Sequence, residues 1–424
     1  MRHFDLRGGV MHAEDVPIPD IAAAVGTPVY IYSTATIARH ARVFREAVAA
    51  TGDPLVAYAV KANPNQAVLA AVARAGLGAD VVSGGELARA RAAGIPADRI
   101  VFSGVGKTEA EMAFALDAGI YQFNLESLPE AEMLSAVAAR MGVTAPAAFR
   151  VNPDVDAGTH AKISTGKSEN KFGIPHRDAL GAYARAAALP GLAMHGIAVH
   201  IGSQLTDLAP LERAFETVGA LIAELRRAGH DIRIADLGGG LGVPYDPDQP
   251  LPPSPEAYGV MVARVTRGWN VRLVFEPGRM IVGNAGALVT RVIRVKEGVE
   301  APFVIVDAGM NDLMRPSLYD AWHDIVAVRP SGAKVTANVV GPVCETGDTF
   351  ATLRRIDQVA AGDLVAFMTA GAYAATMAGT YNSRPLTAEV MVSGDRWAVV
   401  RDRQPIEALI AADSVPHWLD EENA

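Results

Sequence analysis

The sequence predicts an α/β protein: a (β/α)8 barrel joined to a second, mostly β C-terminal domain of sandwich-like or barrel-like form. From about residue 54 to residue 275, short apolar or β-branched runs alternate with longer alanine-rich stretches of helical spacing. Eight such units over roughly 220 residues suit a closed parallel barrel, with a doubly wound open sheet as the alternative. After about residue 279, apolar runs follow one another with few helical stretches between them, which predicts the β domain.

The predicted barrel elements follow from this alternation, in chain order. The eight strands are Leu55–Val60, Ala79–Val82, Ile100–Phe102, Gln122–Leu125, Ala147–Val151, Met194–His200, Ile232–Leu237 and Arg272–Phe275. The helices between them are Gln66–Arg74, Gly85–Ala93, Glu109–Asp117, Pro129–Arg140, Asp178–Ala188 and Leu208–Ala228. Two segments rich in turn-forming residues, Asp154–Gly173 and the proline-rich Tyr245–Pro255, are predicted as loops.

The β domain is predicted from a second set of strands. They are Leu288–Val295, Phe303–Val306, Val335–Val340, Leu364–Met368, Ala388–Val392 and Trp397–Val400. An early strand, Val29–Tyr32, precedes the first helix, Thr34–Ala49, and either domain could hold it. We therefore expect a barrel over residues 34–280, and a β domain that is made of residues 1–33 and 281–424 and completes the active site.

Composition narrows the class of protein. Half of the 424 residues are hydrophobic and the net charge is −9, which indicates a globular chain and argues against nonspecific nucleic-acid binding. The one cysteine, Cys344, excludes an intramolecular disulfide and a cysteine zinc cluster. No apolar run is long enough to cross a bilayer, and the N-terminus lacks a signal-peptide core, so a cytoplasmic protein is expected.

The ends of the predicted strands carry the candidate chemistry, because catalytic groups of a (β/α)8 barrel follow the C-terminal ends of its strands. Lys61 follows the first strand, His200 ends the sixth, and Glu276 with Arg279 follows the eighth. Taken singly, each has an ordinary structural interpretation: an exposed strand-end lysine, a core histidine, an ion pair. The glycine run 238–242 after the seventh strand can cradle a phosphate, although it does not match the dinucleotide fingerprint. An amine, a phosphate cradle and a carboxylate together describe a pyridoxal phosphate site.

Motifs in both domains then identify a family. The relevant stretches are Tyr58–Asn63, Asp80–Leu87, His200–Gln204, Gly238–Gly242, Glu276–Arg279, Met314–Pro316 with Tyr319, Gly341–Glu345, Gly371–Tyr373 and Tyr381–Pro385. In this order, they resemble the diaminopimelate decarboxylase family of fold-type III pyridoxal phosphate enzymes, which is related to alanine racemase. The resemblance implies decarboxylation of meso-2,6-diaminopimelate to L-lysine, the last step of lysine biosynthesis.

The resemblance also implies residue roles around the cofactor. Lys61 would form the covalent link to pyridoxal phosphate, His200 would stack on its ring and Glu276 would pair with the pyridine nitrogen. Alanine racemase has an arginine at that last position, so the glutamate favours decarboxylation. The residues that would bind the phosphate are Ser203, Gly239, Gly240, Gly278 and Tyr373.

Substrate recognition is implied in the same way. Arg279 and Arg315 would hold substrate carboxylate, a task suited to a planar guanidinium. Glu345 would take the distal ammonium, assisted by Tyr319 and Tyr373. Cys344 would return a proton to the α-carbon. The family places this cysteine's loop across a subunit interface, which implies a homodimer with two shared sites. The resemblance implies no metal.

Small departures from the family pattern leave substrate details open. Thr346 stands where the family commonly has serine, and Asp320 and Trp322 stand where glycine and tyrosine are more frequent. A related decarboxylase of carboxynorspermidine, ornithine or arginine is the first alternative function. A pyridoxal phosphate carrier without catalytic activity is the second.

Overall fold

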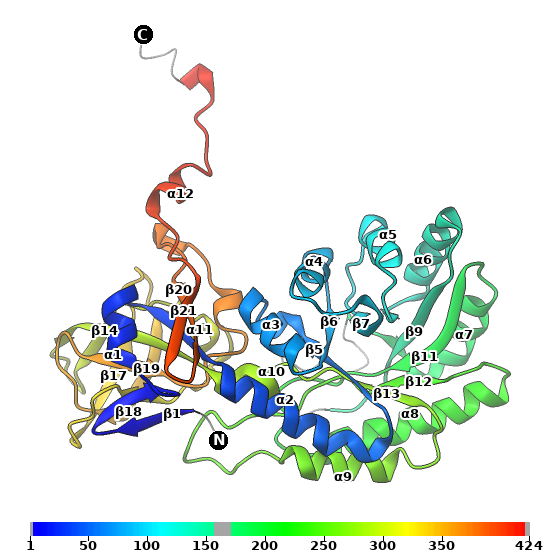
Figure 1. Cartoon of the computed structure of the whole chain (residues 1–424), viewed down its shortest axis with the longest axis horizontal. Coiled ribbons are helices and arrows are strands. Elements are labelled where there is room, and N and C mark those ends of the chain that lie inside the picture. The colour runs from blue at the N-terminus through cyan, green and yellow to red at the C-terminus, as the bar shows by residue number, and fades with distance from the viewer. Residues whose placement is uncertain (1–2, 157–170, 420–424) are drawn as a thin grey trace. The chain divides into compact units, whose positions relative to one another are not determined.

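The computed structural model describes residues 3–156 and 171–419, which form two compact units (Figure 1). One unit is Thr34–Ala285, and the other combines Met1–Ser33 with Gly286–Ala424. We call them the barrel unit and the β unit. The strand Val29–Ser33 (β4) belongs to the sheet of the β unit, and most of the predicted 154–173 loop lies outside the described residues.

The barrel unit is built on a closed parallel sheet. Each strand pairs in parallel with the next, and the ring closes because β8 pairs with β9 and β13 pairs with β5. Closure excludes the doubly wound open sheet and confirms the predicted fold class. The strands are β5 (Leu55–Ala59), β6 (Gly78–Val81), β7 (Ile100–Phe102), β8 (Gln122–Leu125), β9 (Ala145–Asn152), β11 (Leu192–Ala198), β12 (Ile234–Asp236) and β13 (Arg272–Phe275). A short strand, β10 (Ile174–Pro175), adds to β9.

Helices cover the outside of this sheet (Figure 1). They are α2 (Thr34–Val48), α3 (Gln66–Arg74), α4 (Gly84–Ala92), α5 (Glu109–Ala118), α6 (Leu128–Met141), α7 (Ala179–Ala187), α8 (Ala209–Arg227), α9 (Pro255–Val265) and the single turn α10 (Arg279–Val282). Several begin at a capping side chain, such as Thr108, which forms a capping box with Glu111. Helix α9 was not predicted. Its Gly259 packs against the backbone of Ala47 in α2, where a Cβ atom would clash with the carbonyl oxygen.

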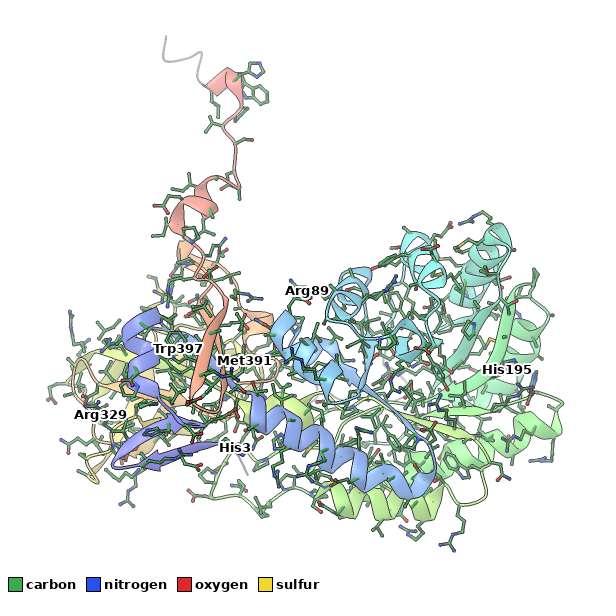
Figure 2. The ribbon with its side chains drawn as sticks, in the orientation of Figure 1. His3, Arg89, His195, Arg329, Met391 and Trp397 are labelled. Atoms are coloured by element: carbon green, nitrogen blue, oxygen red, sulfur yellow. The ribbon has the colours of Figure 1, made fainter. Side chains whose placement is uncertain are left out.

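The β unit contains a nine-stranded mixed sheet. Its strands are β4, β14 (Gly286–Lys296), β15 (Phe303–Val306), β16 (Ile325–Ala327), β17 (Lys334–Val340), β18 (Thr349–Asp357), β19 (Leu364–Phe367), β20 (Ala388–Ser393) and β21 (Arg396–Arg401). Strand β4 lies between β14, which is antiparallel to it, and β20, which is parallel. Met391 and Trp397 lie on the neighbouring strands β20 and β21 (Figure 2).

Side chains on the two faces of β4 have different surroundings, because successive residues of a strand point to opposite faces. Val29 and Ile31 join the buried apolar cluster, whereas the phenol oxygens of Tyr30 and Tyr32 donate hydrogen bonds to the Asp312 carbonyl and to Glu389. A separate three-stranded sheet and three short helices complete the unit. They are β1 (Phe4–Arg7), β2 (Val10–Ala13), β3 (Val16–Pro17), α1 (Ile18–Val25), α11 (Arg315–Tyr319) and α12 (Ile406–Ile410). Among the described residues, none of the helices is both long enough and apolar enough to cross a membrane.

Candidate active site

Lys61 lies at the mouth of the barrel, in the turn that follows β5. Its Nζ atom is 2.5 Å from Oδ2 of Asp80 at the end of the neighbouring strand β6. The Asp80 side chain is fully buried, whereas the Lys61 side chain is 36% exposed to solvent. The amine is therefore held by a buried carboxylate and remains accessible to a small molecule.

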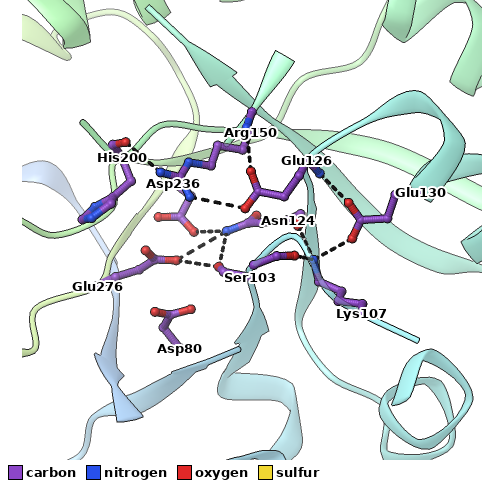
Figure 3. A network of polar contacts seen from close by, with 12 residues as sticks. Asp80, Ser103, Lys107, Asn124, Glu126, Glu130, Arg150, His200, Asp236 and Glu276 are labelled. Atoms are coloured by element: carbon purple, nitrogen blue, oxygen red, sulfur yellow. Dashed lines mark hydrogen bonds and ion pairs between the residues drawn. The ribbon is translucent and has the colours of Figure 1, made fainter. Parts of the chain in front are cut away.

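Three carboxyl groups share the floor of this mouth (Figure 3). Ser103 Oγ donates to Glu276 Oε1 at 3.2 Å, and Asn124 Nδ2 donates to Asp236 Oδ2 at 2.8 Å. Burial raises the pKa of Glu276 well above its ordinary value, and the negative charges of Asp236 and Asp80 raise it further. Burial also raises the pKa of Asp236, so both neighbouring carboxyl groups favour the protonated form. Two negative charges side by side at the floor of the mouth are therefore disfavoured.

The raised pKa of Glu276 makes the stability of the cofactor-free protein depend on pH. A carboxyl group whose pKa is raised by folding stabilises the folded state most below its unfolded pKa, near 4.5 for Glu276. As the pH rises above that value, the free energy of unfolding should fall by up to about 1.4 kcal/mol per pH unit, until Glu276 ionises.

Glu276→Gln should therefore flatten the pH dependence of unfolding in protein stripped of cofactor. The variant should gain stability over the wild type as the pH rises, because a glutamine stays neutral. Urea unfolding over a series of pH values measures this, with Glu224→Gln in helix α8 as an exposed control. Parallel pH profiles for the wild type and Glu276→Gln would contradict a raised pKa of Glu276 in the folded protein.

His200 follows β11 and faces the same mouth (Figure 3). The backbone N–H of Gly239 donates to its Nδ1 at 3.2 Å, and Arg150 Nη2 donates to its carbonyl oxygen at 2.9 Å. Burial lowers the pKa of the imidazole well below its ordinary value, and the cationic groups of Arg150 and Lys61 lower it further. The ring is therefore neutral, accepts at Nδ1 and offers an uncharged flat face.

Glycines bring three loops together beside this ring. A Cβ atom on Gly239 would clash with the carbonyl oxygen of Glu276, and one on Gly240 would lie 2.7 Å from that of Gly202. Gly240 also has a φ of +121°, which disfavours other residues. Gly278 packs closely against the Cβ atoms of Ala59 and Ala62. Backbone that carries no side chains at such a junction suits a phosphate.

Arg279 adds a positive charge to the glycine loops. Its Nη2 donates to Ser203 Oγ at 3.2 Å, and its Nη1 donates to the hydroxyl of Tyr245. The barrel mouth thus holds a lysine amine, a neutral imidazole, a buried acid with a raised pKa and a phosphate cradle with an arginine. These donors fit pyridoxal phosphate, whose groups are an aldehyde, an aromatic ring, a basic ring nitrogen and a phosphate.

The remaining predicted residues lie in the β unit. Arg315 and Tyr319 begin and end helix α11, Cys344 and Glu345 lie in the loop between β17 and β18, and Tyr373 follows β19. Ser317 Oγ donates to the Gly347 carbonyl at 2.6 Å, which ties helix α11 to the Cys344 loop.

The Cys344 loop is itself held by polar contacts. The side chain of Asp348 accepts the backbone N–H groups of Met310 and Val343, each at 2.6 Å. Asn382 accepts the N–H of Cys344 at 3.0 Å, and the Cys344 side chain is exposed. A hydrogen bond to Glu345 raises the pKa of Tyr381, so these two side chains are also paired. The loop therefore presents the thiol in a fixed backbone setting.

Several polar residues around these sites were not predicted to take part. Asp80, Ser103, Asn124 and Asp236 support the barrel mouth, and Tyr245 contacts Arg279. Four of them lie at or just after the end of a barrel strand, as Lys61 does, so strand position was a usable signal for them. Tyr245 lies in the proline-rich loop, and nothing in its local sequence indicates the contact.

Known proteins match the chain over nearly its whole length. Residues 34–283 match the family model for the pyridoxal-binding domain of pyridoxal-dependent decarboxylases. The diaminopimelate decarboxylase of Zymomonas mobilis subsp. mobilis is 58% identical over 98% of this chain and 99% of its own length. That of Neisseria meningitidis serogroup A is 50% identical over 95% of this chain and 98% of its own length.

Solved structures agree with these sequence matches. The M. jannaschii diaminopimelate decarboxylase in complex with L-lysine has a TM-score of 0.94 and 35% identity, covering 99% of this chain and 100% of its own. A Vibrio vulnificus lysine/ornithine decarboxylase, at 21% identity and a TM-score of 0.78 over 89% of this chain and 97% of its own, shares only the fold. The chain therefore belongs to the diaminopimelate decarboxylase family of pyridoxal-dependent decarboxylases.

Proposed function

We propose that this chain uses pyridoxal phosphate to decarboxylate meso-2,6-diaminopimelate to L-lysine and carbon dioxide, the last step of lysine biosynthesis. The observation that supports it best is the barrel mouth, where the Lys61 amine, the buried acid Glu276 and the glycine loops lie together. Whole-length identity to diaminopimelate decarboxylases supports the substrate.

The cofactor supplies a sink for the electron pair that remains on the α-carbon when the carboxylate leaves. In our proposal, Lys61 would hold the cofactor through a covalent link to its amine. His200 packs its neutral ring against the cofactor ring. Glu276 presents its proton to the pyridine nitrogen, and a buried carboxyl with a raised pKa suits that task. The phosphate is assigned to Ser203, Gly239, Gly240, Gly278, Arg279 and Tyr373.

Residues of the β unit are proposed to recognise the substrate. Arg315, together with Arg279, pairs with carboxylate, and Glu345 pairs with the distal ammonium. Tyr319 and Tyr373 assist as hydroxyl donors. Cys344 returns a proton from its thiol to the α-carbon after carbon dioxide has left. Such a site rejects substrates without the distal groups, because its own charges would be left unpaired.

We also propose that two chains form a homodimer with shared active sites. The Cys344 side chain is exposed in the single chain, and so is half of Tyr381 beside it. An exposed proton donor suits a site that is completed by a second copy of the chain. A twofold axis would then complete two equivalent sites at once. A cytoplasmic location is proposed as well, since a chain with a single cysteine and no disulfide suits a reducing compartment.

A product assay tests the function. The purified holoenzyme is incubated separately with meso-diaminopimelate, ornithine, arginine and carboxynorspermidine, and carbon dioxide and the amine product are measured. We expect lysine from diaminopimelate and, for the others, a kcat/KM on the order of 10²-fold lower, since each leaves a charged group of the site unpaired. Turnover of another substrate alone would overturn the roles of Arg279, Arg315 and Glu345. Bound cofactor without any turnover would favour a carrier.

A further inference from the structure

A buried histidine contacts Arg315, and the proposed function gives it no task. His323 is 1% exposed and Arg315 is 6% exposed. Nη1 of Arg315 lies 2.8 Å from Nε2 of His323, and Nδ1 of His323 lies 2.9 Å from the carbonyl oxygen of Met368, just after β19. Both ring nitrogens are therefore engaged.

The chemistry of the two neighbours fixes the proton on this ring. A guanidinium can only donate hydrogen bonds, so Nε2 of His323 must accept and carries no hydrogen. A carbonyl oxygen can only accept, so Nδ1 must carry the hydrogen and donate. One neutral tautomer satisfies both contacts. An imidazolium would lose the bond to Arg315 and place two positive charges side by side.

The backbone around His323 is held from several sides. Asp320, at a φ of +51°, ends helix α11 in the left-handed region, which turns the chain back toward Arg315. Arg354 Nη1 donates to the carbonyl oxygen of His323 at 2.6 Å. The N–H of Met368 donates to the carbonyl oxygen of Asp324 at 2.8 Å. The imidazole is thus oriented before any ligand arrives.

We propose that His323 is a positioning residue for Arg315. It fixes the plane of the Arg315 guanidinium, and this plane is the one in which Arg315 binds the substrate carboxylate. The inference rests on the proposed function of Arg315. An arginine binds a carboxylate best when its fork lies in the carboxylate plane, and a fixed acceptor on Nη1 limits its rotation. The effect should appear in substrate affinity, because binding by Arg315 is the same before and during reaction.

Two substitutions separate this role from that of a plain core residue. His323→Gln keeps an acceptor near the position of Nε2 and loses the donor to Met368. His323→Asn keeps a donor near the position of Nδ1 and loses the acceptor for Arg315. Each variant breaks one of the two hydrogen bonds, so a purely structural role predicts similar losses in both.

Steady-state kinetics of the holoenzyme with meso-diaminopimelate distinguish a positioning role of His323 from a purely structural one. We expect KM to rise about 10- to 100-fold in His323→Asn, with kcat and the cofactor spectrum little changed, because a charged donor has lost its acceptor. KM in His323→Gln should stay within about threefold of the wild type, since that acceptor is kept. Equal rises in KM for both variants, or a fall in kcat alone, would overturn the proposal.

A measurement on the wild-type holoenzyme keeps the inference testable if a variant does not fold. With ¹⁵N-labelled histidine, NMR at neutral pH should show the His323 ring neutral with its hydrogen on Nδ1. An imidazolium, or a hydrogen on Nε2, would overturn the hydrogen bond to Arg315. Failure of the wild type to turn over diaminopimelate would instead overturn the proposed function, and the tautomer would still be decided.

Discussion

Lys61→Ala should lower the rate of diaminopimelate decarboxylation by about 10⁴-fold or more, because the chain loses its covalent hold on the cofactor. The wild type should show the absorbance of covalently bound cofactor, and borohydride should fix the label on the peptide that contains Lys61. The variant should show neither signal. Initial rates of carbon dioxide release and mass spectrometry of the reduced protein measure both effects.

Lys61→Arg is the matched control, because Lys61 is also half of an ion pair. The alanine variant leaves the buried carboxylate of Asp80 without its 2.5 Å cationic partner, whereas arginine keeps a positive charge there. Arginine has no primary amine to link to an aldehyde. Both variants should therefore be inactive, while Lys61→Arg should keep more of the wild-type stability. A borohydride-stable cofactor in either variant would remove Lys61 from its proposed role.

Cys344→Ala should lower kcat by about 10²- to 10⁴-fold, the usual contribution of a positioned proton donor. Cofactor absorbance and the covalent link to Lys61 should be unchanged, because Cys344 is proposed to act only after carbon dioxide has left. Since Cys344 is the single cysteine of the chain, alkylation offers a second measurement. Iodoacetamide should inactivate the wild type, whereas Cys344→Ser should be slow but insensitive to the reagent. Full turnover in Cys344→Ala would exclude the thiol as the donor.

Mixing two inactive variants tests whether sites are shared between chains. If each site takes Lys61 from one chain and Cys344 from its partner, a Lys61→Ala/Cys344→Ala heterodimer has one intact site. Random exchange makes half of the dimers mixed, so activity should return to roughly a quarter of the wild type. A mixture that exchanges subunits and stays inactive would show that each chain supplies its own complete site.

Apolar patterning predicted the barrel well, for a physical reason. The strands Ile100–Phe102, Gln122–Leu125 and Arg272–Phe275 have the predicted bounds, because each is a buried run bordered by polar or turn-forming residues. Strand β1 (Phe4–Arg7) buries only its first residue, and β18 carries charged residues such as Arg354 and Arg355, so neither shows an apolar run. These strands, together with β2, β3, β10 and β16, were not predicted.

The candidate site residues were proposed from their places at strand ends and in family motifs, whereas the polar network around them could not be predicted. Asn124 bonds to Asp236 across 112 positions of sequence, and Ser103 bonds to Glu276 across 173. No local pattern encodes such pairs, because they depend on how the barrel closes. His323 was visible in a stretch noted for its neighbours at 320 and 322, but its contact with Arg315 required the turn at Asp320.

The position of β4 has a consequence for synthesis on the ribosome. This fully buried strand, Val29–Ser33, lies between β14 and β20, both of which come after the whole barrel in the chain. At 5–20 residues per second, the first residues of β14 emerge about 13–50 s after β4 has been made. The barrel can close its own ring during that interval, while β4 waits as an unpaired, apolar edge. The nascent chain is therefore most open to aggregation or chaperone binding at its N-terminal 33 residues.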